Sequence, residues 1–419
     1  MTSAAPAPRS ALWVAAALAL GSAVSLGLAR FSYGLMLPLM RADLGWSYFI
    51  AGAMNTVNAA GYLLGALAAP LGLQRFGARP LFVAGTGATA LSLAAHGFFD
   101  AAQALFALRF MTGLVSALSL VSGAVLAARI GTAAVAPGRP VGAARSPAPA
   151  APSADLPRSG LVLGLYYGGT GLGIVAATLL VPLLANGSGA HSWQPAWIGL
   201  GALALLATAG AAVATRGLVE PADHRRRGGA ARHFDWRAFA PGLVAYLLFG
   251  LGYIGYMTFV VTLLREQNLA PGLVTAFFAM LGLAVVASPW IWAGMLQRFR
   301  GGESLAILNA LLVVATLLPV VATHPMAVFA SGLLFGAVFL SLVTSTTTLI
   351  RHNLPATLWA AGIAAFTIMF ALGQIVGPAL IGFIADQFGG LRAGLACSAA
   401  VLAIAAIVAS RQKPLQPGR

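Results

Sequence analysis

The sequence contains few of the residues that soluble proteins carry at their surfaces. Charged residues occupy 8% of its 419 positions, whereas a soluble domain carries about a quarter. Lys413 is the single lysine, and Cys397 is the single cysteine, which excludes an internal disulfide and a cysteine-based metal cluster. Hydrophobic residues make up 59% of the chain. Water is therefore not the main solvent of this protein.

Acidic side chains are scarce, and none falls in the middle of a long apolar stretch. All nine lie in predicted loops or at predicted helix ends: Asp43, Asp100, Asp155, Glu220, Asp223, Asp235, Glu266, Glu303 and Asp386. Intramembrane proton relays generally use Asp, Glu or His, so no carboxylate is available for one here. The apolar stretches also contain no Ser/His/Asp set, HExxH motif or paired carboxylates. We therefore expect no enzyme, no bound metal and no other cofactor, and the lack of a charged ring or pore loop argues against a channel.

Twelve apolar stretches are present, each long enough to cross a bilayer as a helix. We place them at 12–40, 47–73, 80–99, 102–128, 160–185, 194–215, 239–264, 272–296, 304–323, 325–350, 357–384 and 391–410. The first begins like a secretory signal peptide, but its apolar run continues to Met40, which indicates an uncleaved helix. The predicted fold is therefore an all-α integral membrane protein.

The basic residues indicate how these helices are oriented. With a cytoplasmic N-terminus, 19 of the 24 Lys and Arg residues fall on the cytoplasmic side and three on the outer side. This skew follows the positive-inside rule, so the net charge of +15 requires no nucleic-acid partner. We expect a multi-pass protein of the cell inner membrane, in contact with the lipid bilayer, with both termini in the cytoplasm.

An internal repeat divides the chain into two halves. The residues Leu-Gln-Arg-Phe occur at 73–76 and again at 296–299, an offset of 223. Two parallel six-helix repeats are typical of one class of secondary transporters, which bind solute between the halves. The predicted organisation is a cytoplasmic N-terminus (1–11), a first six-helix bundle (12–215) with an Ala/Pro-rich loop (about 130–158), a basic connector (216–238), a second bundle (239–410) and a cytoplasmic tail (411–419).

Three motifs resemble those of the major facilitator superfamily. The segment from Gln74 to Arg79, including Arg75 and Gly77, is similar to the superfamily's loop motif between helices two and three, with Gln74 where the family has an acidic residue. Arg109 and Gly113 match its R-x-x-x-G motif, which is linked in the family to proton coupling. Gly373, Gly377 and Pro378 resemble its Gly/Pro bend motif. The segments 29–34, 44–47 and 55–62 are similar to the YbfB/YjiJ branch. The resemblance implies a monomeric carrier that moves a small solute by alternating access, with H⁺ as one candidate coupling ion.

Two arginines lie within predicted spans, Arg30 and Arg109. Because charge is costly in a membrane, such residues usually face a cavity or a partner. Each could bind solute or couple its transport, or could lock helices together through backbone carbonyls. Polar side chains predicted to line the same pathway are Tyr33, Asn55, Asn58, Tyr62, Tyr253, Tyr256 and Gln374. For the asparagines, helix packing is an equally good reading.

Two buried cations without counter-charges favour an anionic ligand. We therefore hypothesise transport of a small organic anion. A drug or metabolite efflux carrier and a non-transporting sensor or assembly protein on the same fold remain alternatives.

Overall fold

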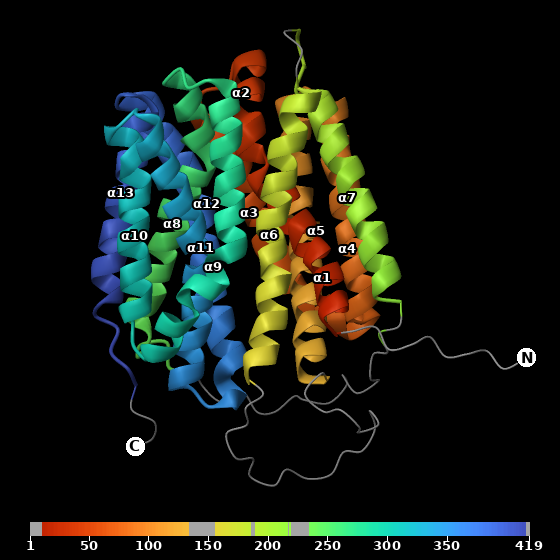
Figure 1. The fold of residues 1–419 in the computed structure, drawn as a ribbon, viewed down its shortest axis with the longest axis vertical. Coiled ribbons are helices and arrows are strands. Elements are labelled where there is room, and N and C mark those ends of the chain that lie inside the picture. The colour runs from red at the N-terminus through yellow and green to blue at the C-terminus, as the bar shows by residue number, and fades with distance from the viewer. Residues whose placement is uncertain (1–10, 134–155, 186–188, 217, 219–233, 416–419) are drawn as a thin grey trace, which may run out of the picture.

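The computed structural model describes residues 11–133, 156–185, 189–216, 218 and 234–415, and every regular element in them is a helix (Figure 1). Twelve of the helical segments described are long and apolar enough to cross a membrane, with lengths of 19 to 33 residues. The twelve-span, all-α prediction is thus confirmed. Most of the predicted Ala/Pro-rich loop and of the basic connector lies outside the described residues, as do residues 1–10 and 416–419.

The helices follow the predicted order, with ends within a few residues of those expected. The first span comprises α1 (Ala11–Ser22), η1 (Ala23–Phe31) and α2 (Tyr33–Leu44). The others in the first half are α3 (Tyr48–Phe76), α4 (Ala78–Ala95) with the 3₁₀ turn η2 (His96–Phe98), α5 (Ala102–Ala133), α6 (Leu156–Leu184) and α7 (Gln194–Ala214). The second half contains α8 (Ala240–Glu266), α9 (Pro271–Arg298), α10 (Glu303–Val321), α11 (Pro325–Asn353), the 3₁₀ turn η4 (Ala356–Leu358), α12 (Trp359–Gln387) and α13 (Gly390–Ala409).

The first span differs from the uninterrupted helix predicted at 12–40. Its middle part, η1, is a π-helix, in which the Ser32 N–H donates to the Gly27 carbonyl five residues earlier, at 3.2 Å. The span also continues to Leu44, where Gly45 ends it with φ of 64°. Arg41 therefore lies in the last turn of α2 rather than in a loop. The apolar content of the sequence indicates how long a span is. It does not indicate which backbone N–H and C=O groups pair, so it does not reveal a π-helix.

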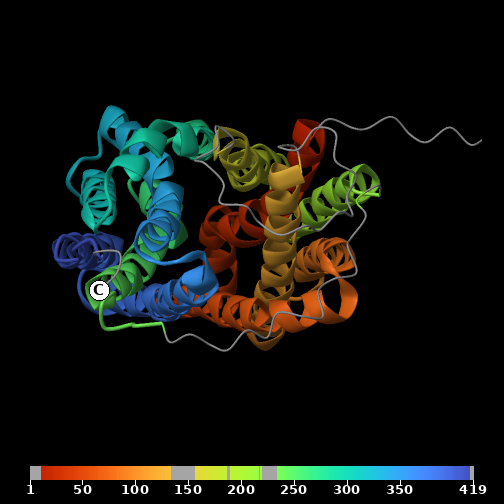
Figure 2. The ribbon, with the colours of Figure 1, turned by 90° about the horizontal axis from the view of Figure 1, so that it is seen from below.

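The helices form two groups, which Figure 2 shows side by side. Helices α1 to α7 pack together as one group and α8 to α13 as the other. Between the groups, α3 lies against α12, α6 against α9, and α2 against α8. We call the end of the bundle where α2 meets α3 the upper end, as in Figure 1, and the end where α3 meets α4 the lower end. The lower end is the predicted cytoplasmic side.

Glycines bring the two groups into backbone contact at three helix pairs. A Cβ atom built on Gly52 of α3 would lie 2.1 Å from the carbonyl oxygen of Pro378 in α12. On Gly34 of α2 it would lie 2.6 Å from the Met257 carbonyl oxygen, and on Gly171 of α6 it would lie 2.4 Å from that of Gly282. Close backbone approach through small residues is a common way for membrane helices to associate. Any side chain at these glycines would push the two halves apart.

Polar side chains join the halves at the upper end. The Asp386 carboxylate, on α12, accepts hydrogen bonds from the backbone N–H groups of Tyr48 and Phe49, at 2.9 and 2.8 Å. It thereby caps the N-terminus of α3 from the other half. Glu266, on α8, accepts a hydrogen bond from the Tyr48 hydroxyl and lies 3.7 Å from the guanidinium of Arg41. These contacts close the upper end.

Candidate functional site

Arg30 lies at the contact between the two halves, in the last turn of the π-helix η1. Its side chain is 4% exposed, and its Nη2 donates to the Gln374 Oε1 of α12 at 2.8 Å. Gln374 in turn donates from Nε2 to the Tyr253 hydroxyl of α8. The guanidinium also lies 5.3 Å from the centre of the Tyr62 ring of α3. Four predicted pathway residues from four spans are therefore brought together.

No carboxylate neutralises Arg30 among the described residues. The ion pairs found there involve Arg41 and His191 with acidic groups near the upper end. The Nε of Arg30 has no hydrogen-bond partner in the described chain. Arg30 is thus a buried cation with a neutral amide as its polar partner.

Arg109 has a different set of contacts, within the first half. Its Nη1 donates to the carbonyl oxygen of Ala29 at 3.0 Å, and its Nη2 donates to the Asn55 Oδ1 at 2.6 Å. Its guanidinium lies 4.5 Å from the centre of the Tyr33 ring. The side chain is 1% exposed. Two of its three nitrogens are therefore committed to protein acceptors, one of them in the π-helix next to Arg30.

The two predicted asparagines have separate partners. Asn58 donates to the Arg109 carbonyl oxygen at 2.9 Å and so joins α3 to α5. Asn55 accepts from Arg109 and donates to the Thr258 hydroxyl of α8 at 2.8 Å, so it connects the two halves. Thr258 was not predicted, since a single threonine in an apolar helix has no distinctive pattern.

Tyr33 and Tyr256, which the repeat aligns with each other, are each held within one half. The Tyr33 hydroxyl donates to the Ala51 carbonyl oxygen at 2.8 Å. The Tyr256 hydroxyl shares a hydrogen bond of 2.6 Å with Ser331, and its ring stacks on Phe335 at 4.0 Å between centroids. Both tyrosines are fully buried. The structure does not bring them to the Arg30 guanidinium, where Tyr62 and Tyr253 lie instead.

Aromatic rings surround the group formed by Arg30 and Gln374. The Tyr253 ring stacks on Phe249, Phe370 and Phe339, with centroid distances of 4.8, 5.5 and 5.9 Å. Phe339 and Phe370 were not predicted from the sequence, where they are indistinguishable from lipid-facing phenylalanines.

The motif residues of the α3–α4 turn lie at the lower end. The chain turns at Gly77, with φ of 85°. Arg79 donates to the Ala212 carbonyl oxygen at the end of α7, at 3.2 Å, while Gln74 and Arg75 are exposed. The structure therefore places this motif away from the Arg30 group, in a turn that connects helices of the first half.

The remaining motif residues serve close helix packing. A Cβ atom on Gly113 would lie 2.0 Å from the Asn58 carbonyl oxygen, and one on Gly377 would lie 2.5 Å from that of Leu251. The carbonyl of Pro378 is the atom that meets Gly52 across the halves. These residues set the spacing of α3, α5, α8 and α12 around the Arg30 group.

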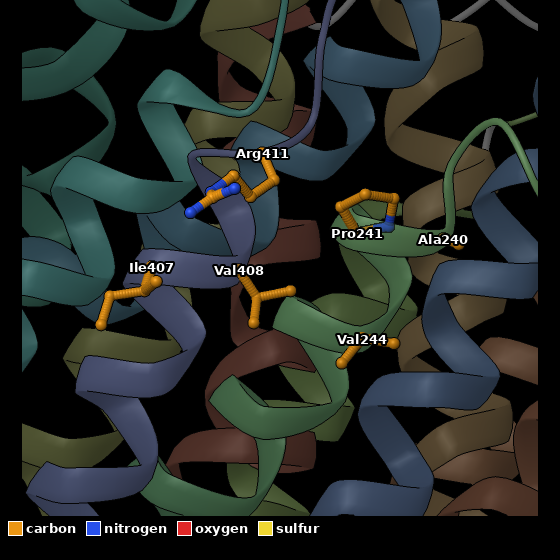
Figure 3. A pocket seen from close by; sticks show the side chains of 6 residues that line it. All are labelled: Ala240, Pro241, Val244, Ile407, Val408 and Arg411. Carbon is orange, nitrogen blue, oxygen red and sulfur yellow. The ribbon is translucent and has the colours of Figure 1, made fainter.

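A shallow pocket between α8 and α13 is not connected with these residues (Figure 3). It is open and apolar, and is lined by Ala240, Pro241, Val244, Ile407, Val408 and Arg411. All six belong to the lower end of the second half. Arg411 is the one polar side chain among these six residues, whereas a solute site usually has several convergent polar groups.

Comparison with known proteins gives a consistent result. The family described as "Uncharacterised MFS-type transporter YbfB" matches residues 22–144 and 150–410. No curated protein sequence matches the chain. The fold is similar to that of the nucleoside transporter NupG, with a TM-score of 0.69 and 13% identity over 96% of this chain and 100% of that one. It is also similar to a bacterial homologue of the human lysosomal transporter Spinster in an inward-facing, occupied conformation, with a TM-score of 0.68 and 15% identity over 97% and 99% of the two chains.

The family match covers most of the chain, and the twelve spans and the two solved folds agree with it. The chain therefore belongs to the YbfB-type transporters of the major facilitator superfamily and is a multi-pass membrane transporter of a small solute, not an enzyme.

Proposed function

We propose that this transporter carries a small organic anion, which Arg30 binds between the two halves. The observation that carries the proposal is the hydrogen bond between Arg30 and Gln374. It places a buried guanidinium at the contact of the halves, and an amide accepts one hydrogen bond from it without cancelling its charge. A carboxylate entering from solution would supply the missing charge and displace the weaker neutral partner.

The energetics of burial support an anionic ligand. Transferring a charge to the bilayer centre costs about 2.5–3.5 kcal/mol on insertion scales. A buried charge is usually retained where a partner or a function offsets this cost. No acidic partner for Arg30 occurs within the described chain. The bound solute is the partner that completes the site.

Arg109 has a supporting role in this proposal. Its two Nη atoms bind Ala29 and Asn55, so it offers a ligand fewer free donors than Arg30 does. It holds the π-helical backbone from which Arg30 projects. Of the two functions open from the sequence, we assign solute binding to Arg30 and helix positioning to Arg109.

Alternating access is the proposed transport mechanism. Asp386 and Glu266 close the upper end, and the distribution of Lys and Arg assigns the lower end to the cytoplasm. We therefore take this conformation to be the one that faces the cytoplasm, in the cell inner membrane with both termini inside.

Because one chain supplies both walls of the site, we propose a monomer as the functional unit.

Purified protein and proteoliposomes test the proposal. Thermal stabilisation by small carboxylates is compared with that by the corresponding neutral amides, and counterflow of a radiolabelled carboxylate is measured with and without a pH gradient. We expect stabilisation and saturable counterflow with carboxylates only. Arg30→Ala should abolish both, whereas Arg392→Ala, which removes an exposed arginine, should change neither. Equal responses to amides and carboxylates would refute anion selectivity, and the pH-gradient arm tests H⁺ coupling.

A further inference from the structure

A set of aromatic rings forms one continuous stack in the second half. Tyr246, Phe249 and Tyr253 lie at i, i+3 and i+7 of α8, on one helix face. Phe370 of α12 stacks on all three, at centroid distances of 4.8, 5.3 and 5.5 Å. The interplanar angles are 15 to 18°. We call these four rings and Phe339 of α11 the aromatic shelf.

The aromatic shelf adjoins the proposed anion site. Phe370 and Gln374 are one helical turn apart on α12, and Gln374 hydrogen-bonds both Arg30 and the shelf residue Tyr253. Phe339 makes an edge contact with Phe31, the neighbour of Arg30, at 5.6 Å. A carboxylate on Arg30 would therefore have the edge of the shelf beside it.

Two tyrosines of the first half form the opposite wall. The Tyr62 ring of α3 has its centre 5.3 Å from the Arg30 guanidinium, and Tyr167 lies on α6. Tyr62 and Tyr167 are both only partly buried, unlike Tyr246 and Tyr253. Both rings therefore keep some accessible surface.

This arrangement is selective in two respects. Phe370 is the shelf ring that is only partly buried, and its accessible surface prefers a flat aromatic group, because stacking adds quadrupole interactions to the burial of apolar surface. Arg30 offers one positive charge, and Arg109 is committed to Ala29 and Asn55. A second carboxylate on the ligand would have no second cation to pair with among these rings, which is unfavourable.

We infer that the solute is an aromatic monocarboxylate. Its carboxylate binds Arg30, and its ring lies between Tyr62 and Tyr167 on one side and the aromatic shelf on the other. The inference rests on the proposed function and specifies the class of anion. It also explains why tyrosines, rather than aliphatic residues, occupy the first-half wall.

Matched pairs of ligands test the inference. Dissociation constants are measured on the purified full-length protein for benzoate and cyclohexanecarboxylate, and for 3-phenylpropionate and 3-cyclohexylpropionate, with benzamide as the uncharged control. We expect each aromatic acid to bind about tenfold tighter than its saturated counterpart. Equal affinity within both pairs, or no binding by any of the four acids, would overturn the inference. Equal binding of benzamide and benzoate would instead refute the proposed anion site.

A variant then locates the preference. Phe370→Leu should bring each aromatic acid to the affinity of its saturated counterpart while leaving binding of the saturated acid unchanged. Phe278→Leu is the matched control, since Phe278 is a buried ring of α9 outside the shelf, and it should preserve the tenfold preference. Unchanged preference in a folded Phe370→Leu protein would show that the rings serve only packing. If that variant does not fold, Tyr62→Leu tests the opposite wall with the same readout.

Discussion

Arg109 donates a hydrogen bond to the carbonyl oxygen of Ala29, the residue immediately before Arg30. One arginine thereby fixes the backbone that carries the other. The two residues looked equivalent as isolated charges in apolar spans. Their contacts separate them, because Arg109 stays within its own half and Arg30 reaches the other. The predictions below follow from this difference and from the contacts between the halves.

Gln374→Glu should abolish anion binding without loss of stability. The new carboxylate would lie at the position of the amide oxygen, 2.8 Å from the Arg30 Nη2, and would neutralise the guanidinium from within the protein. We expect the affinity for a carboxylate ligand to fall by about a hundredfold or more, with an unchanged or higher melting temperature. Binding is measured by calorimetry and stability by thermal unfolding. Binding retained at the level of the unmodified protein would contradict the assignment of Arg30 as the anion site.

Arg109→Ala should reduce stability as well as binding. It removes the guanidinium donors from the Ala29 carbonyl oxygen and the Asn55 Oδ1, and the loss of a buried hydrogen-bond partner costs about 1–3 kcal/mol for each such group. Arg30→Ala removes an unneutralised charge and should cost much less stability, although it eliminates binding. Thermal unfolding and ligand affinity measured on both variants distinguish the roles. The reverse ranking of the two melting temperatures would argue against the positioning role of Arg109.

Gly52→Ala should disturb the conformational equilibrium rather than the fold. Its methyl group would meet the Pro378 carbonyl oxygen across the two halves, so closure of the upper end becomes unfavourable. Gly61→Ala is a matched control, because its methyl group would lie 2.0 Å from the Phe110 carbonyl oxygen within the first half. Spin labels at Ala42→Cys and Gln387→Cys, in a Cys397→Ser background, report the width of the upper end. We expect a longer distance for Gly52→Ala, and for Gly61→Ala lower stability at an unchanged distance.

Asp386→Asn should weaken the closed upper end. An amide has one oxygen acceptor, whereas the carboxylate uses both oxygens to bind the Tyr48 and Phe49 N–H groups. Because Asp386 is exposed, we expect a loss of about 1 kcal/mol, equivalent to a several-fold shift towards the open state. The same spin-label pair measures it. Asp100→Asn is the control, since the contact of Asp100 with His191 lies within the first half, and a shift of equal size there would exclude a specific role for Asp386.

The sequence predicted the parts of this protein that depend on composition. Bilayer thickness sets the length of each apolar run, so the twelve spans could be counted and their ends placed within a few residues. Arg30, Tyr62, Tyr253 and Gln374 were recognisable because polar groups are rare in such spans. Their convergence on one point was not predictable, since it depends on how each helix is rotated about its axis. Composition contains no such information for helices that are apolar on every side.

The same limit explains the residues that the sequence did not predict. Thr258 and Phe370 gain their roles from partners in the other half, which no local pattern describes. Tyr33 and Tyr256 were both predicted to line the pathway as polar side chains within spans, and both hydroxyls bind within their own halves. The internal repeat gives Tyr33 and Tyr256 equivalent positions in their two bundles. The hydrogen-bond partner of each side chain, however, depends on residues that have diverged between the halves.

Because Arg30 lies near the end of a π-helical segment, the direction in which its side chain points depends on how many residues precede it in the first span. A π turn holds more residues than an α turn, so removing one residue between Ala23 and Phe31 would let the segment relax to α-helical winding. The deletion would then remove the surplus residue of the π turn, so the helix beyond it would keep nearly the same direction. A deletion in α1, where the winding is already α-helical, has no surplus residue to lose. It would rotate everything beyond it by roughly 100° relative to the start of the span and turn Arg30 away from Gln374. The π-helix is therefore the stretch of the first span in which the loss of one residue is absorbed.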